Sequence, residues 1–315
     1  MPSTRAVVAW LATVPCTVFY AFRLFGWDDF YPATQVMAYA PYVAAAAVIP
    51  VATALLLRRW VAAGVAGLVL VLFAAALLPR MTADDSAAHR GTRLNVMSAN
   101  LLGGTADPAA LLELVKVHAV DVLTLQEYTP SFERKVRALG IDALLPYRVA
   151  HPKGDVFGSA AVYARFPLAD KGLRINPPDF GQAMAEMSVG GQVIPIESVH
   201  TRAPGNRQAT PWWQESFGVQ PPADPDGPPR ILAGDFNATL DHSPLRALIA
   251  TGYRDAADVL GDGLTPTWPF DGRVLPPVTI DHVLADKRIG IEAYEVLRLP
   301  GSDHRPILAT VSLPA

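Results

Sequence analysis

The sequence contains a single cysteine and few charged residues, and both shortages narrow what the chain can be. The only cysteine, Cys16, lies inside an apolar run, so no intrachain disulfide and no cysteine-based metal site is possible. We interpret Cys16 as a thiol buried in a membrane segment rather than a lipoprotein cleavage site, because Pro15 stands where a small residue is expected. Charged residues make up 17% of the 315 residues, against roughly a quarter in an ordinary soluble protein. The apolar excess is concentrated in the first 80 residues.

Basic charge is scarce in the larger, C-terminal part of the chain. Of the 26 Lys/Arg and 29 Asp/Glu residues, the first 80 positions hold five and two, which leaves 21 and 27 for residues 81–315 and a net charge near −6. Enzymes that act on nucleic acids usually present a basic face, because phosphate contacts supply most of their affinity. The charge balance therefore disfavours a nucleic acid as partner, although it does not exclude a local basic stripe.

Three apolar runs in the first 80 residues predict a membrane anchor. They cover about residues 6–22, 36–57 and 61–78, and each is near the ~20 residues that cross a bilayer core of ~30 Å. A signal peptide is the alternative for the first run, but no small-residue cleavage site follows it and two more runs come directly after. Residues 1–80 are therefore expected to be a three-helix transmembrane anchor, with the lipid bilayer as its partner.

The basic residues of the anchor predict its orientation. Arg5 precedes the first run and Arg58-Arg59 separate the second from the third, so the positive-inside rule places both in the cytoplasm. Three crossings then put everything after Arg80 outside the cytoplasm, in a multi-pass protein of the cell membrane. Arg80, Arg90 and Arg93 argue mildly the other way. Residues 81–92 show no periodicity and are predicted to be a linker, followed by a catalytic domain over residues 93–315.

The pattern after the linker alternates short apolar strands with helical segments. Strands are predicted at 94–97, 121–125, 160–163, 185–189, 193–199, 231–233, 278–284 and 307–311, and helices at 108–118, 131–139 and 243–249. This mixture over ~220 residues predicts two packed β-layers with helices outside.

Polar side chains fall repeatedly where the apolar strands end. They are Asn100, Glu127, His200, Asp235 and Asn237, together with Asp281 just inside its strand and Asp303-His304 in the turn before the last strand. Acidic and imidazole groups beside apolar strands are costly to bury unless they are paired or bind a cation. Eight such residues in one pattern predict a site at the rim of the sheets.

These residues occur in motifs that resemble the endonuclease/exonuclease/phosphatase (DNase I-like) superfamily. The motifs are VMSANLLGG, DVLTLQE, IESVHTRAP, GDFNAT, TIDHVLAD and GSDHRPI, and they follow in order from Leu94 to Leu313. The superfamily includes DNase I, abasic-site endonucleases, sphingomyelinases and inositol phosphatases. The resemblance implies an α/β fold, a four-layer α/β-sandwich of two packed β-sheets flanked by helices. One departure is Ala99, where members often carry Trp, a residue that packs rather than reacts.

The resemblance also implies a metal-dependent hydrolysis of phosphate esters. Carboxylate and amide oxygens suit Mg²⁺, with Mn²⁺ as a substitute, and Glu127 is the main expected ligand, helped by Asn100 and Asp303. Asp235 is expected to orient the attacking water. The remaining catalytic expectations are Asn237 and His200 as donors to phosphoryl oxygens and His304, oriented by Asp281, as a cation that stabilises the transition state.

Two features beside the motifs allow more than one interpretation. Trp212 and Trp213 either contact a lipid or form the packing face of a helix. Arg202 and Arg207 either hold a second phosphate or lie in a solvated loop.

Three substrate hypotheses follow. The anchor favours a phosphatase acting on a lipid phosphate or polyprenyl pyrophosphate, because it holds the active site near the bilayer. The arrangement also resembles membrane-anchored actinobacterial members of the superfamily linked to glycopeptide (teicoplanin) resistance, which implies a carrier of cell-wall synthesis. The alternatives are an extracytoplasmic nuclease or phosphodiesterase, including a sphingomyelinase-like enzyme, and a binding module on a degenerate scaffold, which the intact motif set disfavours. No motif separates monoesterase, diesterase and pyrophosphatase.

Overall fold

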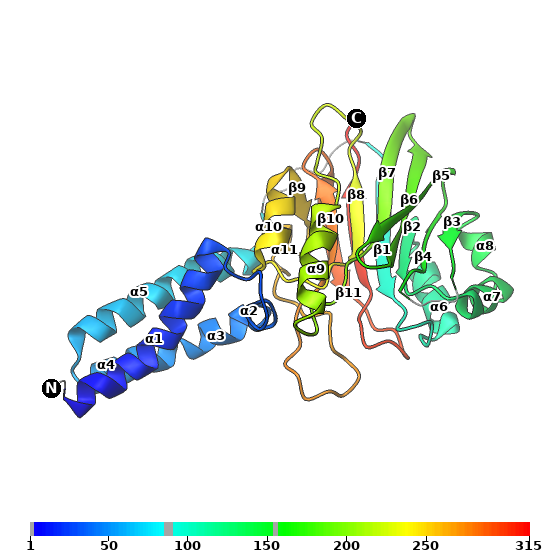
Figure 1. Ribbon diagram of the computed structural model, residues 1–315. Coiled ribbons are helices and arrows are strands. Elements are labelled where there is room, and N and C mark those ends of the chain that lie inside the picture. The colour runs from blue at the N-terminus through cyan, green and yellow to red at the C-terminus, as the bar shows by residue number, and fades with distance from the viewer. Residues whose placement is uncertain (1–2, 85–90, 154–156) are drawn as a thin grey trace.

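Two six-stranded β-sheets pack face to face in the C-terminal two thirds of the chain (Figure 1). The computed structural model describes residues 3–84, 91–153 and 157–315. The first sheet has the order β11-β12-β1-β2-β4-β3, and the second has the order β5-β6-β7-β8-β10-β9. The strands of the first sheet are β11 (Gly290–Val296), β12 (Ile307–Ser312), β1 (Arg93–Asn100), β2 (Val122–Gln126), β4 (Ala160–Ala164) and β3 (Tyr147–His151). Those of the second are β5 (Leu168–Asn176), β6 (Phe180–Val189), β7 (Gln192–His200), β8 (Ile231–Asp235), β10 (Asp281–Asp286) and β9 (Tyr253–Asp255).

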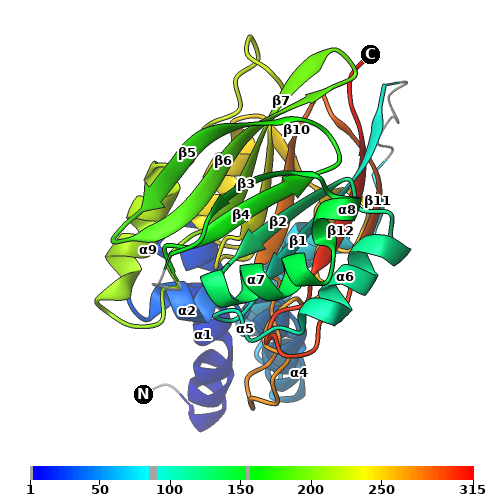
Figure 2. The ribbon, with the colours of Figure 1, turned by 90° about the vertical axis from the view of Figure 1, so that its right-hand side faces the viewer.

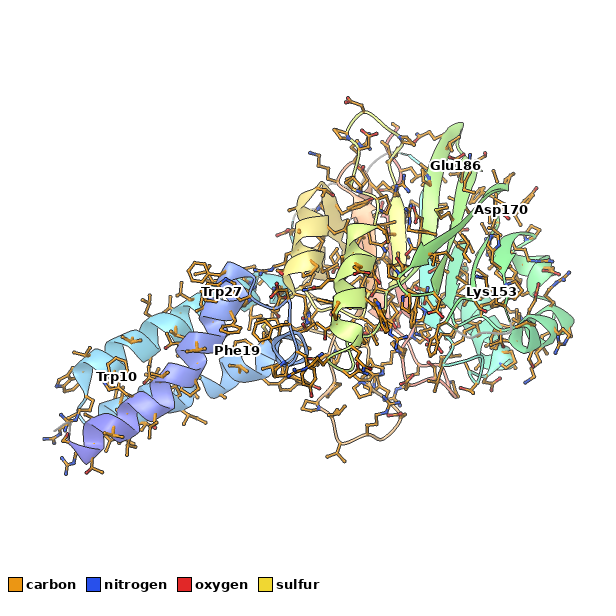
Figure 3. The ribbon with its side chains drawn as sticks, in the orientation of Figure 1. Trp10, Phe19, Trp27, Lys153, Asp170 and Glu186 are labelled. Atoms are coloured by element: carbon orange, nitrogen blue, oxygen red, sulfur yellow. The ribbon has the colours of Figure 1, made fainter. Side chains whose placement is uncertain are left out.

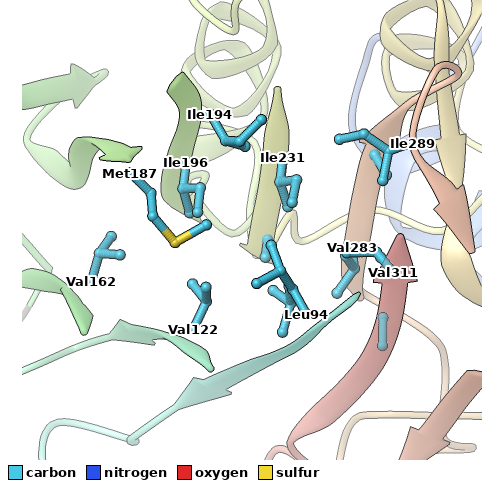
Figure 4. Close-up of a cluster of buried hydrophobic side chains, with 14 of the residues drawn as sticks. Leu94, Val122, Val162, Met187, Ile194, Ile196, Ile231, Val283, Ile289 and Val311 are labelled. Carbon is cyan, nitrogen blue, oxygen red and sulfur yellow. The ribbon is translucent and has the colours of Figure 1, made fainter. Parts of the chain in front are cut away.

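Apolar side chains fill the space between the sheets and lie under the helices outside them. The central cluster joins residues such as Val122 and Ile196 from facing strands (Figure 4). Helices α6 (Pro108–Val117), α7 (Pro130–Ala138) and α8 (Ile141–Leu144) cover the first sheet, and α9 (Ala209–Gly218) and α10 (Ser243–Ala250) cover the second (Figure 2). A further short helix, α11 (Ala256–Val259), follows β9. The predicted four-layer α/β-sandwich is confirmed.

The strand predicted at 278–284 begins later than expected. Val278 instead pairs with Trp268 in an isolated bridge, and β10 starts at Asp281. Asp281 is therefore the first residue of its strand rather than an interior one. This shift brings its side chain to the end of the sheet, opposite Asp235 in the antiparallel pairing of β10 with β8.

The N-terminal region has two helices that are long and apolar enough to cross a membrane, not the three that the sequence predicts. They are α1 (Thr4–Phe25) and the helix that contains α5 (Trp60–Leu77) and continues into the 3₁₀ turn η1 (Leu78–Met81). The expected helix at 36–57 is divided into α2 (Ala33–Met37), α3 (Ala40–Ala46) and α4 (Val48–Leu56). Pro50 explains the break at Ala47, because proline has no N–H for the carbonyl of Ala46 four residues earlier.

The outward surface of these helices is apolar. Leu11, Leu56, Trp60 and Val61 are all more than two thirds exposed. Figure 3 shows aromatic side chains such as Trp10 and Phe19 on α1, while charged side chains such as Glu186 stand on the far part of the molecule. Contiguous exposed apolar surface of this kind marks a contact with a membrane or another protein. Length and composition therefore point to membrane association, and we call residues 4–81 the anchor.

A buried ion cluster fixes the anchor to the catalytic domain. Arg23, near the end of α1, and Arg80, in η1, both bind the carboxylate of Asp241, at 2.6 and 2.9 Å. Burial raises the pKa of Asp241, but the two guanidinium groups outweigh it and hold the pKa below its ordinary value. Asp28 accepts a hydrogen bond from the backbone N–H of Ser243 at 2.7 Å. A buried charge left without its partner is strongly destabilising, so these contacts hold the two parts in one arrangement.

Part of the predicted linker is attached to the catalytic domain. Ala83 forms a β-bridge with Leu260, and the N–H of Asp84 donates to the carbonyl of Val259 at 2.7 Å. Residues 85–90 of the linker predicted at 81–92 lie outside the described residues.

Candidate active site

Strand register brings the polar strand ends to one edge of the two sheets. β1 and β2 run parallel, as do β7 and β8, so Asn100 lies beside Gln126 and His200 lies beside Asp235. β12 runs antiparallel to β1 and starts opposite Ser98, so the turn before it also lies at this edge. All eight residues singled out from the sequence therefore gather at one rim: Asn100, Glu127, His200, Asp235, Asn237, Asp281, Asp303 and His304.

Asp235 lies at the centre of this group and is almost fully buried. Its carboxylate accepts hydrogen bonds from Asn100 Nδ2 at 3.0 Å and from the backbone N–H of Asn237 at 2.8 Å. Burial raises the pKa of Asp235 to about 7, against the lowering effect of the His304 cation. A carboxylate with a pKa near neutrality is suited to accept a proton from water, because general bases work best when their pKa is close to the operating pH.

His304 is held between carboxylates. Its Nδ1 lies 3.0 Å from Asp281 Oδ2, and its Nε2 points toward Asp235 Oδ2 at 3.7 Å. Burial alone would lower the pKa of His304, but Asp281 and Asp235 raise it to about 10. The imidazole is thus a cation at neutral pH, and its Nε2–H is directed into the site, where negative charge on a phosphoryl group would be met.

His200 behaves differently from His304, although both are buried. Burial, the His304 cation and the nearby Arg202 lower the pKa of His200 to about 3, so the ring is neutral. Its Nε2 lies 3.8 Å from Glu127 Oε1 and 3.9 Å from Asp235 Oδ2, and the ring packs on Phe180. A neutral imidazole has one N–H to offer, so His200 suits a hydrogen-bond donor rather than a charge.

Glu127 follows β2 in a backbone conformation that a glutamate rarely adopts. Its φ is +57°, and Asn237 across the site has a φ of +47°. Non-glycine residues in this region cost about 1–3 kcal/mol and tend to occur at functional sites. The carboxylate accepts from the N–H of Gly103 at 2.5 Å and from Asn100 Nδ2 at 3.3 Å, which fixes its position beside Asp235.

Asn237 has its side-chain amide partly committed. Its Nδ2 donates to the carbonyl of Thr201 at 3.0 Å, and the backbone carbonyl of Asn237 accepts from Trp213 Nε1 at 3.0 Å. An amide nitrogen carries two protons, so one donor is left for a ligand. Trp213 is fully buried under the second sheet, which shows that it serves the packing of α9.

Asp303 is the residue that most needs a further partner. Its Oδ2 accepts from Trp268 Nε1 at 2.9 Å and pairs with Arg273 at 3.1 Å. Its Oδ1 is buried and has no hydrogen-bond partner among the described residues. An unpaired buried carboxylate oxygen is costly, and a bound cation would satisfy it.

The donor set around Glu127 and Asp303 fits a divalent metal. Burial raises the pKa of Glu127, and the nearby Asp303 carboxylate raises it further. Two carboxylates that repel each other provide the hard oxygen ligands that Mg²⁺ and Mn²⁺ prefer, whereas the Asn100 amide directs its Nδ2 toward Glu127 and its oxygen toward the Leu102 N–H. Asp235, Asp281 and His304 form a second group with metal-ligand spacing. Those residues already satisfy one another, and a protonated imidazole has no lone pair for a metal.

Several residues of the site were not predicted from the sequence. Trp268 and Arg273 bind Asp303, Ser302 accepts from the His304 backbone N–H at 3.0 Å, and Gly103 holds Glu127. Trp268 and Arg273 come from a proline-rich loop with no periodicity, and no sequence signal indicated that this loop folds over the site.

The structure shows different surroundings for Arg202 and Arg207, the two arginines with two possible interpretations. The Arg202 guanidinium lies over the rings of Phe180 and Trp212, at 5.0 and 5.6 Å from their centroids. Arg207 is exposed in the loop before α9. Arg202 thus borders the site beside His200, whereas Arg207 lies in solvent.

A family model and solved structures agree with this geometry. The model described as the Endonuclease/Exonuclease/phosphatase family matches residues 97–304. Comparison with curated protein sequences gives no match.

The similar solved structures share the fold at low identity. A humanized D. rerio TDP2 with 14 mutations is 17% identical, with 70% of this chain and 99% of that chain covered and a TM-score of 0.57. An endonuclease/exonuclease/phosphatase family protein from Bacteroides thetaiotaomicron is also 17% identical, with 72% and 100% covered and a TM-score of 0.52. D. rerio TDP2 complexed with a single-strand DNA product is 16% identical, with 70% and 99% covered and a TM-score of 0.55. Identities this low show the fold alone.

Proposed function

The chain belongs to the endonuclease/exonuclease/phosphatase family, whose members hydrolyse phosphoester bonds, and from that premise we propose that it is a membrane-anchored, metal-dependent phosphatase. Its proposed substrate is a lipid phosphate or a polyprenyl pyrophosphate at the membrane face. The observation that carries the proposal is the direct attachment of the catalytic edge to the anchor.

The attachment runs through the segment that follows the catalytic strand β8. Asn237 is four residues before Asp241, which binds Arg23 and Arg80 of the anchor. The next residue, His242, contacts the carbonyl of Thr34 through Nε2 at 2.8 Å. An active site held this close to apolar helices meets membrane-bound substrates at high effective concentration. A soluble nucleic acid gains nothing from that arrangement.

The residues of the site divide the work of hydrolysis. Asp235, oriented by Asn100, aligns the attacking water and takes its proton. His304, kept protonated by Asp281, stabilises the negative charge that develops on the phosphoryl group. Glu127 and Asp303 would hold the metal, with Asn100 beside them, and the bound metal supplies positive charge to the phosphate oxygens. Asn237 and His200 donate hydrogen bonds to those oxygens.

A cavity next to His304 supports a substrate with more than one phosphate. It measures about 410 Å³ and is lined by Arg298, Arg305, Ser302 and Phe270 as well as His304. Neither arginine forms an ion pair within the described part of the chain. Burial and the charge of Arg298 lower the pKa of Arg305, which shows two like charges held together. Such a pair is suited to bind a second anionic group, as in a pyrophosphate.

We place the catalytic domain outside the cytoplasm. Arg5 and Arg58-Arg59 remain the basic residues at the far end of the anchor, and the positive-inside rule assigns that end to the cytoplasm. Arg80, which argued against this orientation, is buried against Asp241 rather than free at the membrane surface. A cell-wall lipid carrier, as in glycopeptide resistance, would be accessible on that side.

The substrate class is tested with the detergent-solubilised full chain. We expect phosphate release from polyprenyl pyrophosphate, and little or no hydrolysis of sphingomyelin or plasmid DNA, because only the first combines an anchored tail with clustered phosphates. Phosphate release and DNA nicking are measured in parallel. Cleavage of DNA or sphingomyelin with no release from polyprenyl pyrophosphate would show a nuclease or phosphodiesterase instead.

Metal removal should abolish activity. With excess chelator we expect hydrolysis to stop, and to return with Mg²⁺ or Mn²⁺, because a divalent metal would supply the positive charge that the phosphate oxygens need between Glu127 and Asp303. Glu127→Gln should raise the Mg²⁺ concentration for half-maximal activity by about tenfold or more, given that even outer-shell changes cost about 10–100-fold in affinity. Glu133→Gln is the control, because Glu133 lies on α7 and faces Arg137 and Arg148 rather than the site. Full activity in chelator would refute the metal-dependent mechanism.

A further inference from the structure

A cavity lies where the anchor meets the catalytic domain. It measures about 350 Å³, near the lower end of the ~300–1,000 Å³ found for ligand pockets. We call it the junction cavity. Its anchor wall comes from α3 and the residues just before it, including Pro41 and Ala45, and its catalytic wall includes Leu240, Leu264 and Val278. The two walls are tied together at the rim by a hydrogen bond of 2.6 Å from the Tyr42 hydroxyl to the carbonyl of Pro277.

The polar groups of the junction cavity are already paired. Arg80 donates to both oxygens of Asp241, at 2.9 and 3.2 Å, and to the carbonyl of Leu240 at 3.0 Å. The Thr279 hydroxyl donates to the carbonyl of Thr265 at 2.8 Å. The wall therefore has mainly apolar surface free to contact a ligand. A phosphate would find few hydrogen-bond donors here. A hydrocarbon chain loses nothing by entering, because its burial needs no polar partner.

The junction cavity adjoins the catalytic centre. Thr279 in its wall is two residues before Asp281, and Thr239 is two residues after Asn237. Asp281 binds His304, and His304 lines the other cavity, of about 410 Å³, together with Arg298 and Arg305. The apolar junction cavity is thus lined two residues from Asp281, and the cationic cavity is lined by its partner His304. An amphipathic molecule with its reacting phosphate at His304 matches this arrangement.

The anchor provides a route for such a molecule. α4 follows α3 after the break at Ala47, and its outward residues Val48 and Ile49 are exposed and apolar. Ala45 is also exposed, so the junction cavity opens along the same face of the anchor. A chain that lies against α4 in a bilayer can extend along α3 into the cavity without crossing a charged surface.

We propose that the junction cavity binds the hydrocarbon chain of the substrate next to its phosphate, so that the anchor forms part of the substrate-binding site. This proposal rests on the proposed function, a phosphatase for membrane lipids. It predicts that the enzyme selects its substrate by the apolar chain as well as by the phosphate, and that residues of the anchor set this selectivity.

Filling the junction cavity is the test. In Ala45→Trp an indole occupies the space between α3 and the catalytic wall, and tryptophan is well tolerated at membrane interfaces. We compare kcat/KM for farnesyl diphosphate and for dimethylallyl diphosphate, whose chain is too short to fill the cavity. The wild type should prefer farnesyl diphosphate, and Ala45→Trp should lower that preference about tenfold or more, as for other changes in hydrophobic pockets. Activity on dimethylallyl diphosphate should fall much less than activity on farnesyl diphosphate.

Matched controls separate chain binding from general damage. Ala46→Trp lies on the same helix, is exposed, and does not line the cavity, so it should behave as the wild type. Ala38→Leu fills the cavity with a smaller side chain and should give a weaker effect of the same kind. An unchanged preference in Ala45→Trp, or an equal loss on both substrates, would overturn the proposal.

A readout without catalysis distinguishes this proposal from the proposed function. A farnesyl diphosphate analogue with a diazirine at the chain end should crosslink to the peptides containing Leu264 and Val278 in the wild type, and not in Ala45→Trp. Crosslinking to these peptides without hydrolysis would support chain binding in the junction cavity and contradict the phosphatase assignment. Hydrolysis with crosslinking only to other peptides would support the phosphatase assignment and contradict chain binding in the junction cavity.

Discussion

Asp235→Asn is expected to lower kcat by about 10²–10⁴-fold, the range for a positioned acid or base. The amide keeps the shape of the side chain and still accepts the hydrogen bond from the Asn237 backbone N–H. It loses the negative charge that pairs with His304 and the basic oxygen that takes a proton from water. Because burial brings the pKa of Asp235 to about 7, the wild-type carboxylate accepts that proton readily near neutral pH.

The matched control for this variant is Asp286→Asn. Asp286 is also buried and lies at the other end of β10, where it binds Arg288 rather than the site. Steady-state kinetics on the true substrate are compared with thermal unfolding followed by circular dichroism. If Asp235→Asn keeps more than about a third of wild-type kcat with an intact fold, Asp235 is not the base that the mechanism requires.

Strands in the interior of the sheets were predicted from the sequence, and strands at the edges were not. All eight predicted strands are present, and each lies in the interior of its sheet. The four strands that were not predicted, β3, β5, β9 and β11, are the four edges of the two sheets. The edge strand β5 is largely exposed and carries charged residues such as Lys171, and β9 is only three residues long. The apolar pattern that identifies a buried strand is therefore absent from them.

In the anchor, hydropathy identified the apolar segments but not where the second helix breaks. Average hydropathy over residues 36–57 predicted one continuous helix. The segment is apolar, but it forms three short helices. Hydropathy does not register that Pro41 starts a helix at its first turn or that Pro50 removes a backbone donor. The resulting break places α3 against the catalytic domain, and that contact creates the junction cavity.

The members of the site and the protonation of His304 were predictable, but the lowered pKa of His200 and the raised pKa of Asp235 were not. Strand ends identify which side chains reach the rim, and the structure brings all eight together. The sequence predicted a protonated His304 beside Asp281 and assigned His200 only as a donor, and the structure makes His304 a cation and His200 a neutral ring. The difference comes from Asp281, which contacts His304 at 3.0 Å, while the nearest carboxylate to His200 is 3.8 Å away. Such distances depend on the packing of both sheets, and the assigned catalytic roles stay predictions.

His304→Ala should lower kcat to about the same extent as Asp235→Asn, by about 10²–10⁴-fold. The variant removes the cation that faces Asp235 at 3.7 Å and that meets the charge of the phosphoryl group. The double variant should lose much less than the product of the two single losses, because groups that act as one unit are not additive. Multiplicative losses would show that the two residues act independently.

Asp281→Asn tests the same cation through its pH dependence. Burial lowers the pKa of His304, and Asp281 is the strongest group that raises it, to about 10 in the wild type. Without that carboxylate the pKa falls, so the imidazole loses its proton at a lower pH. The alkaline limb of kcat should therefore move toward neutral pH, and activity should recover as the pH is lowered. Ser302→Ala, which removes only a hydrogen bond to the His304 backbone, should leave the limb in place. A uniform loss of kcat at every pH in Asp281→Asn would mean that Asp281 only orients the ring, because a positioning role alone does not move the limb.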